Sequence, residues 1–196
     1  MDLLAHALYG ATFCSRTGLA GGLRGRPPAP RRAWRRDASL WWAIVFGVLP
    51  DLASMGVPFV VLAVNGTPGP FLHDFFHGLD AGAIVIYRLF HSLLTALLVC
   101  AALWLARPRL FVASLAWPLH LLMDSVSHGL GKYQTTLFYP LSDWALDGIR
   151  WWMSPRFVMA YWCALPTIWT ALHLARSRPA AGGRMARHGN AEGKPA

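Results

Sequence analysis

The sequence has little charge and almost no glutamate. Charged residues make up 14% of the 196-residue chain and the mean hydropathy is +0.38, whereas a typical soluble domain has about 25% charged residues. This composition excludes an ordinary water-soluble domain and indicates a protein embedded in a membrane. Eight of the nine acidic residues are Asp, and the single Glu is Glu192. Isolated Asp residues in an apolar chain indicate caps, turns or ligands.

The sequence also lacks paired cysteines and a basic N-terminal stretch. Cys14, Cys100 and Cys163 stand alone in apolar segments without CxxC spacing, so we expect packing residues rather than a disulfide framework. No Lys or Arg precedes the first apolar run, MDLLAHALYG. That pattern does not predict a cleavable signal peptide.

Positive charge is abundant but confined to a few segments. The formal net charge is +9, with 18 Lys and Arg against 9 Asp and Glu. Most of the basic residues lie within 16–36 and 176–194, as the positive-inside rule produces in membrane proteins. Because no basic and aromatic recognition motif accompanies the charge, we expect no nucleic acid partner. The expected partner is membrane lipid, and the oligomeric state is left open.

Four apolar stretches approach the roughly 20 residues that a spanning helix needs. They cover residues 39–63, 81–106, 110–128 and 157–175, and a shorter apolar segment covers 2–15. We therefore predict an all-α, multi-pass transmembrane helical bundle with four main spans plus a short N-terminal helix, which either spans or stops short. The transmembrane domain is expected over residues 1–176, and a basic, disordered cytoplasmic tail over 177–196.

The basic loops set the expected orientation. Residues 16–38, 107–109 and 176–196 are expected to face the cytoplasm, and residues 65–80 and 129–154 to face outward. This alternation is consistent across all four main stretches. At about 1.5 Å of rise per helical residue, the ionisable residues of the apolar segments then lie at similar depth in the outer half of the bilayer.

The stretch HLLMDSVSHG places His120, Asp124 and His128 four residues apart in an apolar segment. Helical residues at this spacing drift by only about 40° per step, so the three share one face. Burying an ionisable group in a bilayer costs roughly several kcal/mol. A divalent metal offsets that cost, because imidazole and carboxylate are good ligands for Zn²⁺. The alternative is that these groups hydrogen-bond to neighbouring helices.

Two other apolar stretches carry polar residues at matching depth. Asp51 follows Pro50 in LPDLA, which indicates either a simple proline kink or a site carboxylate beside one. In YRLFHSLL, His91 is a candidate ligand or base, and Ser92 is expected to bond its own helix backbone. Arg88 either snorkels outward or holds an anionic substrate.

The outward loops carry weaker signals. His73 and His77 in HDFFHGLD have the i, i+4 spacing of metal ligands, but a wet interfacial helix is the preferred interpretation. The loop YPLSDWALDGIRWW combines Trp and Tyr, which typically form an interfacial belt, with Asp143 and Asp147. These two Asp residues are expected to cap short helices, and the alternative is that they lie over the site.

The ordered set of motifs resembles a known family. MDLLAHALYGA at the start, LPD at 49–51, RLFHS at 88–92, HLLMDSVSHG at 120–129 and TLFYPLSDW at 136–144 are similar to motifs of the YdjM-like family. Its members are LexA-regulated, inner-membrane proteins classed as metal-dependent hydrolases by prediction. The similarity runs from residue 1 to about residue 157 and implies a multi-pass helical protein of the bacterial inner membrane. The matching polar positions are His6, Asp51, His91, His120, Asp124 and His128.

The leading hypothesis is a membrane-embedded, metal-dependent hydrolase that acts on a lipid or lipid-linked ester or phosphoester through a metal-activated water. The expected cofactor is a divalent metal, Zn²⁺ first, with Mn²⁺ or another ion as the alternative. The expected metal ligands are His6, His91, His120, Asp124 and His128. Asp51 is the expected proton acceptor, and Arg88 the expected stabiliser of an anionic oxygen. The alternative is a non-enzymatic membrane protein whose buried His and Asp pass protons or ions, or hold helices together.

Overall fold

The computed structural model describes residues 1–23, 37–56, 60, 64 and 81–177. These residues contain helices and connecting segments but no β-strand, so the prediction of an all-α fold is confirmed for them. In chain order the helices are α1 (Leu3–Cys14), α2 (Leu19–Leu23), α3 (Ala38–Asp51), the π-helix η2 (Leu52–Gly56), α6 (Ala81–Phe90), α7 (Leu93–Ala106), α8 (Pro108–Ser114), α9 (Ala116–Ser127), the 3₁₀-helix η3 (Trp151–Met153) and α10 (Pro155–Ser177).

Three continuous helical stretches are long and apolar enough to cross a membrane, which is consistent with a membrane protein. They are Ala38–Gly56, Pro108–Ser127 and Pro155–Ala175. A fourth candidate is the pair Gly82–Phe90 and Leu93–Ala106, which is bent by 55°. On α7, Leu98, Trp104 and Leu105 are 72%, 61% and 78% exposed. Such a large exposed apolar surface is unusual in a soluble monomer and suits contact with lipid.

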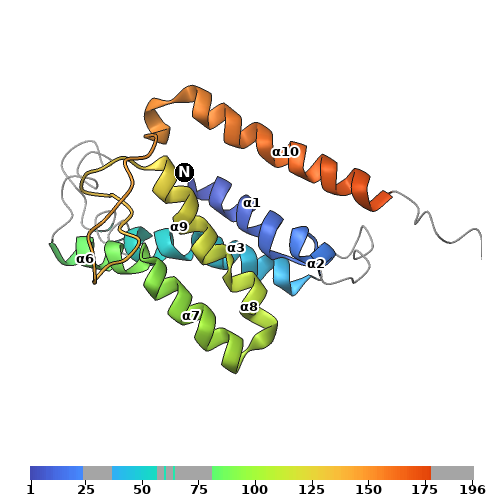
Figure 1. Ribbon diagram of the computed structural model, residues 1–196, viewed down its shortest axis with the longest axis horizontal. Coiled ribbons are helices and arrows are strands. Elements are labelled where there is room, and N and C mark those ends of the chain that lie inside the picture. The colour runs from blue at the N-terminus through green and yellow to red at the C-terminus, as the bar shows by residue number, and fades with distance from the viewer. Residues whose placement is uncertain (24–36, 57–59, 61–63, 65–80, 178–196) are drawn as a thin grey trace, which may run out of the picture.

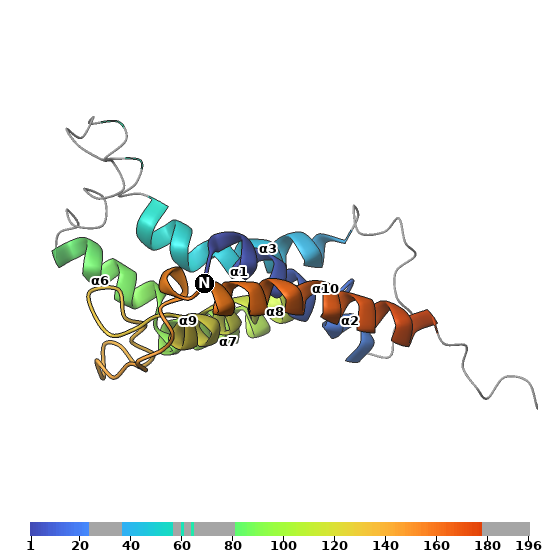
Figure 2. The same cartoon turned by 90° about the horizontal axis from the view of Figure 1, so that it is seen from above.

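The bundle has a central helix and a peripheral one. Within the most apolar 18 residues of each candidate span, 56% are buried in Pro108–Ser127, against 11% in Pro155–Ala175. α1 packs against α3, α9 and α10, and α10 runs along the outside next to α1 (Figure 1). In both views the connection between α9 and α10 lies at the same end as the N-terminus and α6, whereas α2 lies at the other end (Figure 2).

Two glycines allow α1 and α3 to approach each other closely. A Cβ atom on Gly10 would lie 2.8 Å from the carbonyl oxygen of Ala43, and one on Gly47 would lie 2.8 Å from the carbonyl oxygen of His6. Real Cβ atoms essentially never come this close to another heavy atom. Small residues at a helix crossing let two backbones meet in this way in membrane proteins. The crossing therefore holds His6 against the turn of α3 that contains Gly47.

Asp2 fixes the start of α1 and ties it to α10. Its Oδ1 accepts a hydrogen bond from the backbone N–H of Ala5 at 2.9 Å, as an N-cap residue does. Its Oδ2 accepts from the Tyr161 hydroxyl at 2.6 Å and from the Trp162 indole at 3.2 Å. Donors thus surround both oxygens, which indicates a structural role for Asp2.

The predicted span 81–106 is broken at His91 and Ser92. Ser92 has an extended backbone (φ −98°, ψ 128°), and its hydroxyl donates to the carbonyl oxygen of Tyr139 at 2.6 Å. The backbone N–H of Leu93 donates to the carbonyl oxygen of Leu137 at 2.8 Å. The prediction that Ser92 bonds its own helix backbone is therefore wrong. Carbonyl oxygens of the distant segment 137–139 accept the hydrogen bonds of the Ser92 hydroxyl and the Leu93 N–H instead. The break leaves His91 at the end of α6, fully buried.

Candidate metal centre

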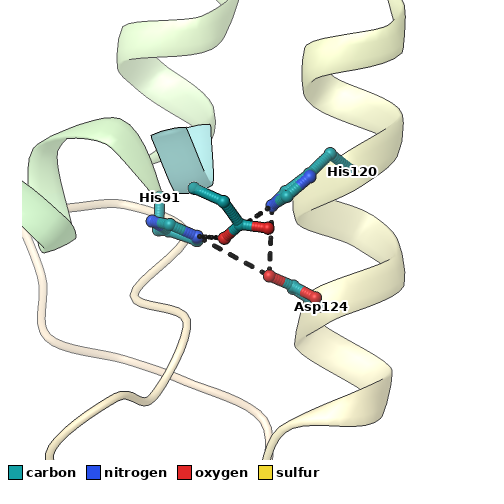
Figure 3. A group of neighbouring side chains, drawn as sticks. His91, His120 and Asp124 are labelled. Atoms are coloured by element: carbon teal, nitrogen blue, oxygen red, sulfur yellow. Dashed lines mark ion pairs between the residues drawn. The ribbon is translucent and has the colours of Figure 1, made fainter. Parts of the chain in front are cut away.

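Four side chains from three separate segments meet inside the bundle. Asp51 ends α3, His91 follows α6, and His120 and Asp124 lie one turn apart on α9. One potential ligand atom of each residue lies within 4.8 Å of those of the other three. Figure 3 shows the rings of His91 and His120 and the carboxylate of Asp124 turned toward a common point. This group of four could hold a divalent metal ion.

The His–Asp separations suit the coordination shell of one ion. The Nε2 atom of His91 lies 3.3 Å from Asp51 Oδ1 and 3.6 Å from Asp124 Oδ2. The Nε2 atom of His120 lies 3.2 Å from Asp124 Oδ2 and 3.7 Å from Asp51 Oδ1. Ligand atoms of a tetrahedral Zn²⁺ with bonds of about 2.0–2.1 Å lie about 3.3 Å apart. The four separations, 3.2–3.7 Å, lie around that value.

Backbone carbonyls fix the orientation of both imidazoles. His91 Nδ1 lies 3.0 Å from the carbonyl oxygen of Tyr87, and His120 Nδ1 lies 2.7 Å from that of Gly47. Because a carbonyl oxygen only accepts, each Nδ1 carries the proton, and the Nε2 of a neutral ring is then an acceptor. Histidines that bind metals typically donate their other ring N–H to a carbonyl or carboxylate in this way.

The group of four presents lone pairs and negative charge with no donor between them. Among the described residues, the Nε2 atoms of His91 and His120 have no hydrogen-bond partner, although carboxylate oxygens lie within 3.7 Å. Acceptors that face one another in an apolar bundle repel unless positive charge lies between them. A divalent cation between the four groups would accept both Nε2 lone pairs and offset both carboxylate charges at once, so the geometry fits one divalent cation.

The second oxygen of Asp124 faces a different set of groups. His6 Nε2 lies 2.9 Å from Oδ1, His128 Nδ1 3.3 Å and the Met1 nitrogen 2.7 Å. His6 also stacks on His120, with ring centroids 3.7 Å apart. The structure thus gathers the four predicted histidine ligands around the carboxylate of the fifth, Asp124. His6 and His128, however, contact the oxygen that faces away from the group of four.

The proline of LPD changes the helix around Asp51. Pro50 has no N–H, so it cannot donate the usual bond to the preceding turn, and the chain continues from Leu52 as the π-helix η2. The Ser54 hydroxyl donates to the Pro50 carbonyl oxygen at 2.6 Å. π-helical turns are rare and frequently lie at functional sites. Asp51 is also the accessible member of the group, since its side chain is 28% exposed and the others at most 2%.

Arg88 does not join the group of four. Its Nη1 lies 3.1 Å from Asp143 Oδ1, and its guanidinium carbon lies 6.0 Å from the centre of the Tyr139 ring. The pair links α6 to the connection between α9 and α10. Asp147 in the same connection accepts the backbone N–H of Leu130 at 3.1 Å. The interpretation of these two Asp residues as structural therefore agrees with their contacts.

Sequence reasoning missed the groups that support the site. The accepting carbonyls of Gly47 and Tyr87 have no sequence signal, because any residue carries a carbonyl. Lys132 and Arg150 were also missed as candidates, although they are the basic residues of the stretch 129–154. His73 and His77 lie outside the described residues.

The chain was compared with protein-family models, curated proteins and solved structures, and no match was found. The chemistry of the candidate centre therefore follows from its own residues. These are two carboxylates and two oriented imidazoles, buried between helices that are apolar enough to span a membrane.

Proposed function

We propose that the protein is a membrane-embedded, metal-dependent hydrolase of a lipid or lipid-linked ester, with one divalent ion held by Asp51, His91, His120 and Asp124. The observation that carries the proposal is the pair of imidazoles whose Nδ1 protons go to backbone carbonyls while both Nε2 lone pairs face two carboxylates. Zn²⁺ suits this nitrogen and oxygen set, and Mn²⁺ is the alternative.

A divalent ion held by these four residues would act as a Lewis acid and would lower the pKa of a bound water for hydrolysis at neutral pH. The chain supplies the remaining functions. The Oδ1 atom of Asp51 faces both imidazoles, which leaves its Oδ2 as the candidate proton acceptor. His6 and His128 hold Asp124 through its Oδ1, so its Oδ2 stays directed at His91 and His120.

The surroundings of Asp51 support a substrate that comes from the membrane. Leu52, the next residue, is 52% exposed, and the neighbouring helix α6 exposes Val85, Ile86 and Leu89. An apolar surface beside the accessible carboxylate suits the hydrocarbon part of a lipid, because contact between the two removes apolar area from water. A water-soluble ester has no such contact to gain.

We further propose that the end of the bundle near α2 faces the cytoplasm. Arg16 and Arg109, from two different connections, line the same small cavity there, together with Ser39 at the start of α3. Basic residues at one end of a bundle are typical of the cytoplasmic side. The resemblance to the YdjM-like family supports a bacterial inner membrane, and the basic residues among 176–196 support a cytoplasmic C-terminus.

Metal analysis of the purified protein tests the proposed function. We expect about one equivalent of metal per chain, and close to none in the His120→Ala/Asp124→Ala variant. A fluorescent lipid ester should be hydrolysed by the metal-loaded protein, and chelation should abolish the activity. His173→Ala in α10 is the matched control, because it removes a histidine outside the centre. Equal, negligible metal in both proteins overturns the proposal, and proton flux in proteoliposomes that survives chelation favours proton passage instead.

A further inference from the structure

A cavity of about 240 Å³ lies in the connection between α9 and α10. One wall is the turn that follows α9, residues 129–133, and the other is formed by Arg150, Trp152 and Met153 at η3. The connection lies at the same end of the bundle as the N-terminus (Figures 1 and 2). A cavity of this size suits a small polar group rather than a whole lipid.

The walls of this cavity contact residues that support the candidate metal centre. The Trp152 ring lies 5.9 Å from the ring of His128, measured between centroids, and His128 contacts Asp124. On the other wall, the Tyr133 carbonyl oxygen accepts the Tyr87 hydroxyl at 2.9 Å. Tyr87 stacks on His91 with ring centroids 4.0 Å apart. One layer of side chains therefore separates the cavity from the group of four on each wall.

Two basic side chains line the cavity. Lys132 places its Nζ 5.7 Å from the centre of the Tyr133 ring. Arg150 has no ion-pair partner within 4.0 Å in the part of the chain that the structure describes, unlike Arg88, which pairs with Asp143. Asp147 Oδ1 lies close by, since it and Arg150 Nε are 3.2 and 2.6 Å from the position that a Cβ atom on Gly129 would take. The guanidinium of Arg150 is therefore near one carboxylate but not held in an ion pair, so it can donate to an anion.

Gly129 allows Arg150 to lie across the turn. A Cβ atom on Gly129 would lie 2.6 Å from Arg150 Nε and 3.0 Å from its Cγ. A side chain at position 129 would therefore push the arginine away from its present place. This contact offers a way to displace the guanidinium without removing its charge.

We propose that this cavity binds the phosphate-bearing headgroup of an anionic membrane lipid and thereby selects the substrate of the hydrolase. The inference rests on the proposed function and names its substrate class. Arginine and lysine bind phosphate oxygens through charge-assisted hydrogen bonds, and Trp and Tyr rings suit the headgroup level of a membrane. Leu130 and Met153, which are 49% and 68% exposed, lie beside the basic pair and can contact the acyl chains.

The binding test uses the full-length, metal-loaded protein in detergent. Native mass spectrometry would measure retained phosphatidylglycerol against phosphatidylcholine, and inorganic phosphate would be added as a competitor. We expect preference for phosphatidylglycerol, and Arg150→Ala should weaken it by about tenfold or more, because a charge-assisted contact is lost. Gly129→Ala should also weaken it. Arg156→Ala, which removes the same charge outside the cavity, should change it less than about twofold.

Metal content, measured on the same samples, separates this inference from the proposed function. Unchanged metal with reduced lipid binding in Arg150→Ala supports the headgroup site. Equal retention of the two lipids, or equal effects of Arg150→Ala and Arg156→Ala, overturns it whatever the metal content. Arg150-dependent binding of inorganic phosphate without retention of phosphatidylglycerol overturns the assignment to a lipid.

Discussion

The two ends of α3 carry carboxylates in opposite chemical surroundings. At its start, Asp37 Oδ1 accepts the N–H and hydroxyl of Ser39 at 3.0 and 2.6 Å, and Oδ2 accepts the N–H and hydroxyl of Thr17 at 3.0 and 2.7 Å. At its other end, Asp51 Oδ1 faces the Nε2 atoms of His91 and His120, whose protons sit on Nδ1. Donors saturate the first carboxylate, and acceptors face the second.

This difference separates a structural acid from a candidate ligand. A carboxylate with four donors has its charge stabilised within the protein, as Asp37 does. A carboxylate that faces lone pairs is stabilised only by an added cation, and burial raises the free-energy cost of an uncompensated charge. The distinction comes from the hydrogen-bond partners, since both residues are Asp at the ends of one apolar helix.

The largest expected effect is on metal affinity at the Asp51 end of α3. Asp51→Asn removes a charged ligand and should weaken Zn²⁺ binding by about 100-fold or more, which exceeds the 10–100-fold loss typical when a residue that only supports a ligand is changed. Asp37→Asn should leave the affinity unchanged. Competition against a chelator of known affinity measures both. Similar losses in the two variants would show that the comparison of their partners has no functional meaning.

A smaller loss of metal affinity is expected at His6, which contacts the oxygen of Asp124 that faces away from the group of four. His6 contacts Asp124 Oδ1 and stacks on His120, so His6→Ala should weaken Zn²⁺ binding by about 10–100-fold without abolishing it. The same chelator competition measures the loss, with His173→Ala as the control. An affinity equal to that of the unaltered protein would mean that the Oδ1 side of Asp124 does not position the ligands.

Spacing and helix breaks allowed the polar residues of the site to be predicted from the sequence. His120 and Asp124 share a face because four residues make about one helical turn, and Asp51 stands out because it follows a proline in an apolar run. Their grouping in space could not be deduced in the same detail. The place of His6 at the second oxygen of Asp124 depends on the close crossing of α1 and α3 at Gly10 and Gly47.

Contacts between distant segments explain the other differences. The span over 81–106 is broken where carbonyl oxygens of residues 137–139 accept hydrogen bonds from Ser92 and Leu93. The local sequence does not indicate such a distant partner. Arg88 pairs with Asp143, 55 residues further along the chain. A sequence pattern reports which face of a helix is polar, but the crossing of helices decides which residue each polar group meets.

A smaller effect, on stability, is expected at the crossing that supports the Asp51 end. A methyl group at Gly47 would lie 2.8 Å from the His6 carbonyl oxygen, whereas one at Gly56 meets nothing within 4 Å. Gly47→Ala should therefore destabilise the protein by about 1–3 kcal/mol through overpacking, and Gly56→Ala should have little effect. Thermal unfolding of the metal-free proteins in detergent compares them. Equal unfolding temperatures would show that the crossing is not tightly packed.

The smallest effect is expected at the other end of α3. Asp37 is its N-cap, so Asp37→Ala should cost about 1 kcal/mol at neutral pH. Burial raises the pKa of Asp37, but hydrogen bonds from Ser39 and Thr17 outweigh it and hold the pKa below its usual value. Because the pKa of Asp37 is lower in the folded state, its ionised carboxylate stabilises the fold. This stabilisation is complete above pH 3.8, the pKa in the unfolded state, and is lost as the pH falls through the pKa of the folded state.

The difference in stability between the unaltered protein and Asp37→Ala should therefore be largest at pH 7, hold at pH 5 and shrink at about pH 3. Thermal unfolding of the metal-free proteins at these three pH values measures it, and metal affinity at pH 7 should be the same in both. A difference that stays constant with pH would mean that Asp37 acts without its charge. The contrast between the two ends of α3 would then lie in geometry alone, because the same carboxylate would cap the helix equally well when protonated.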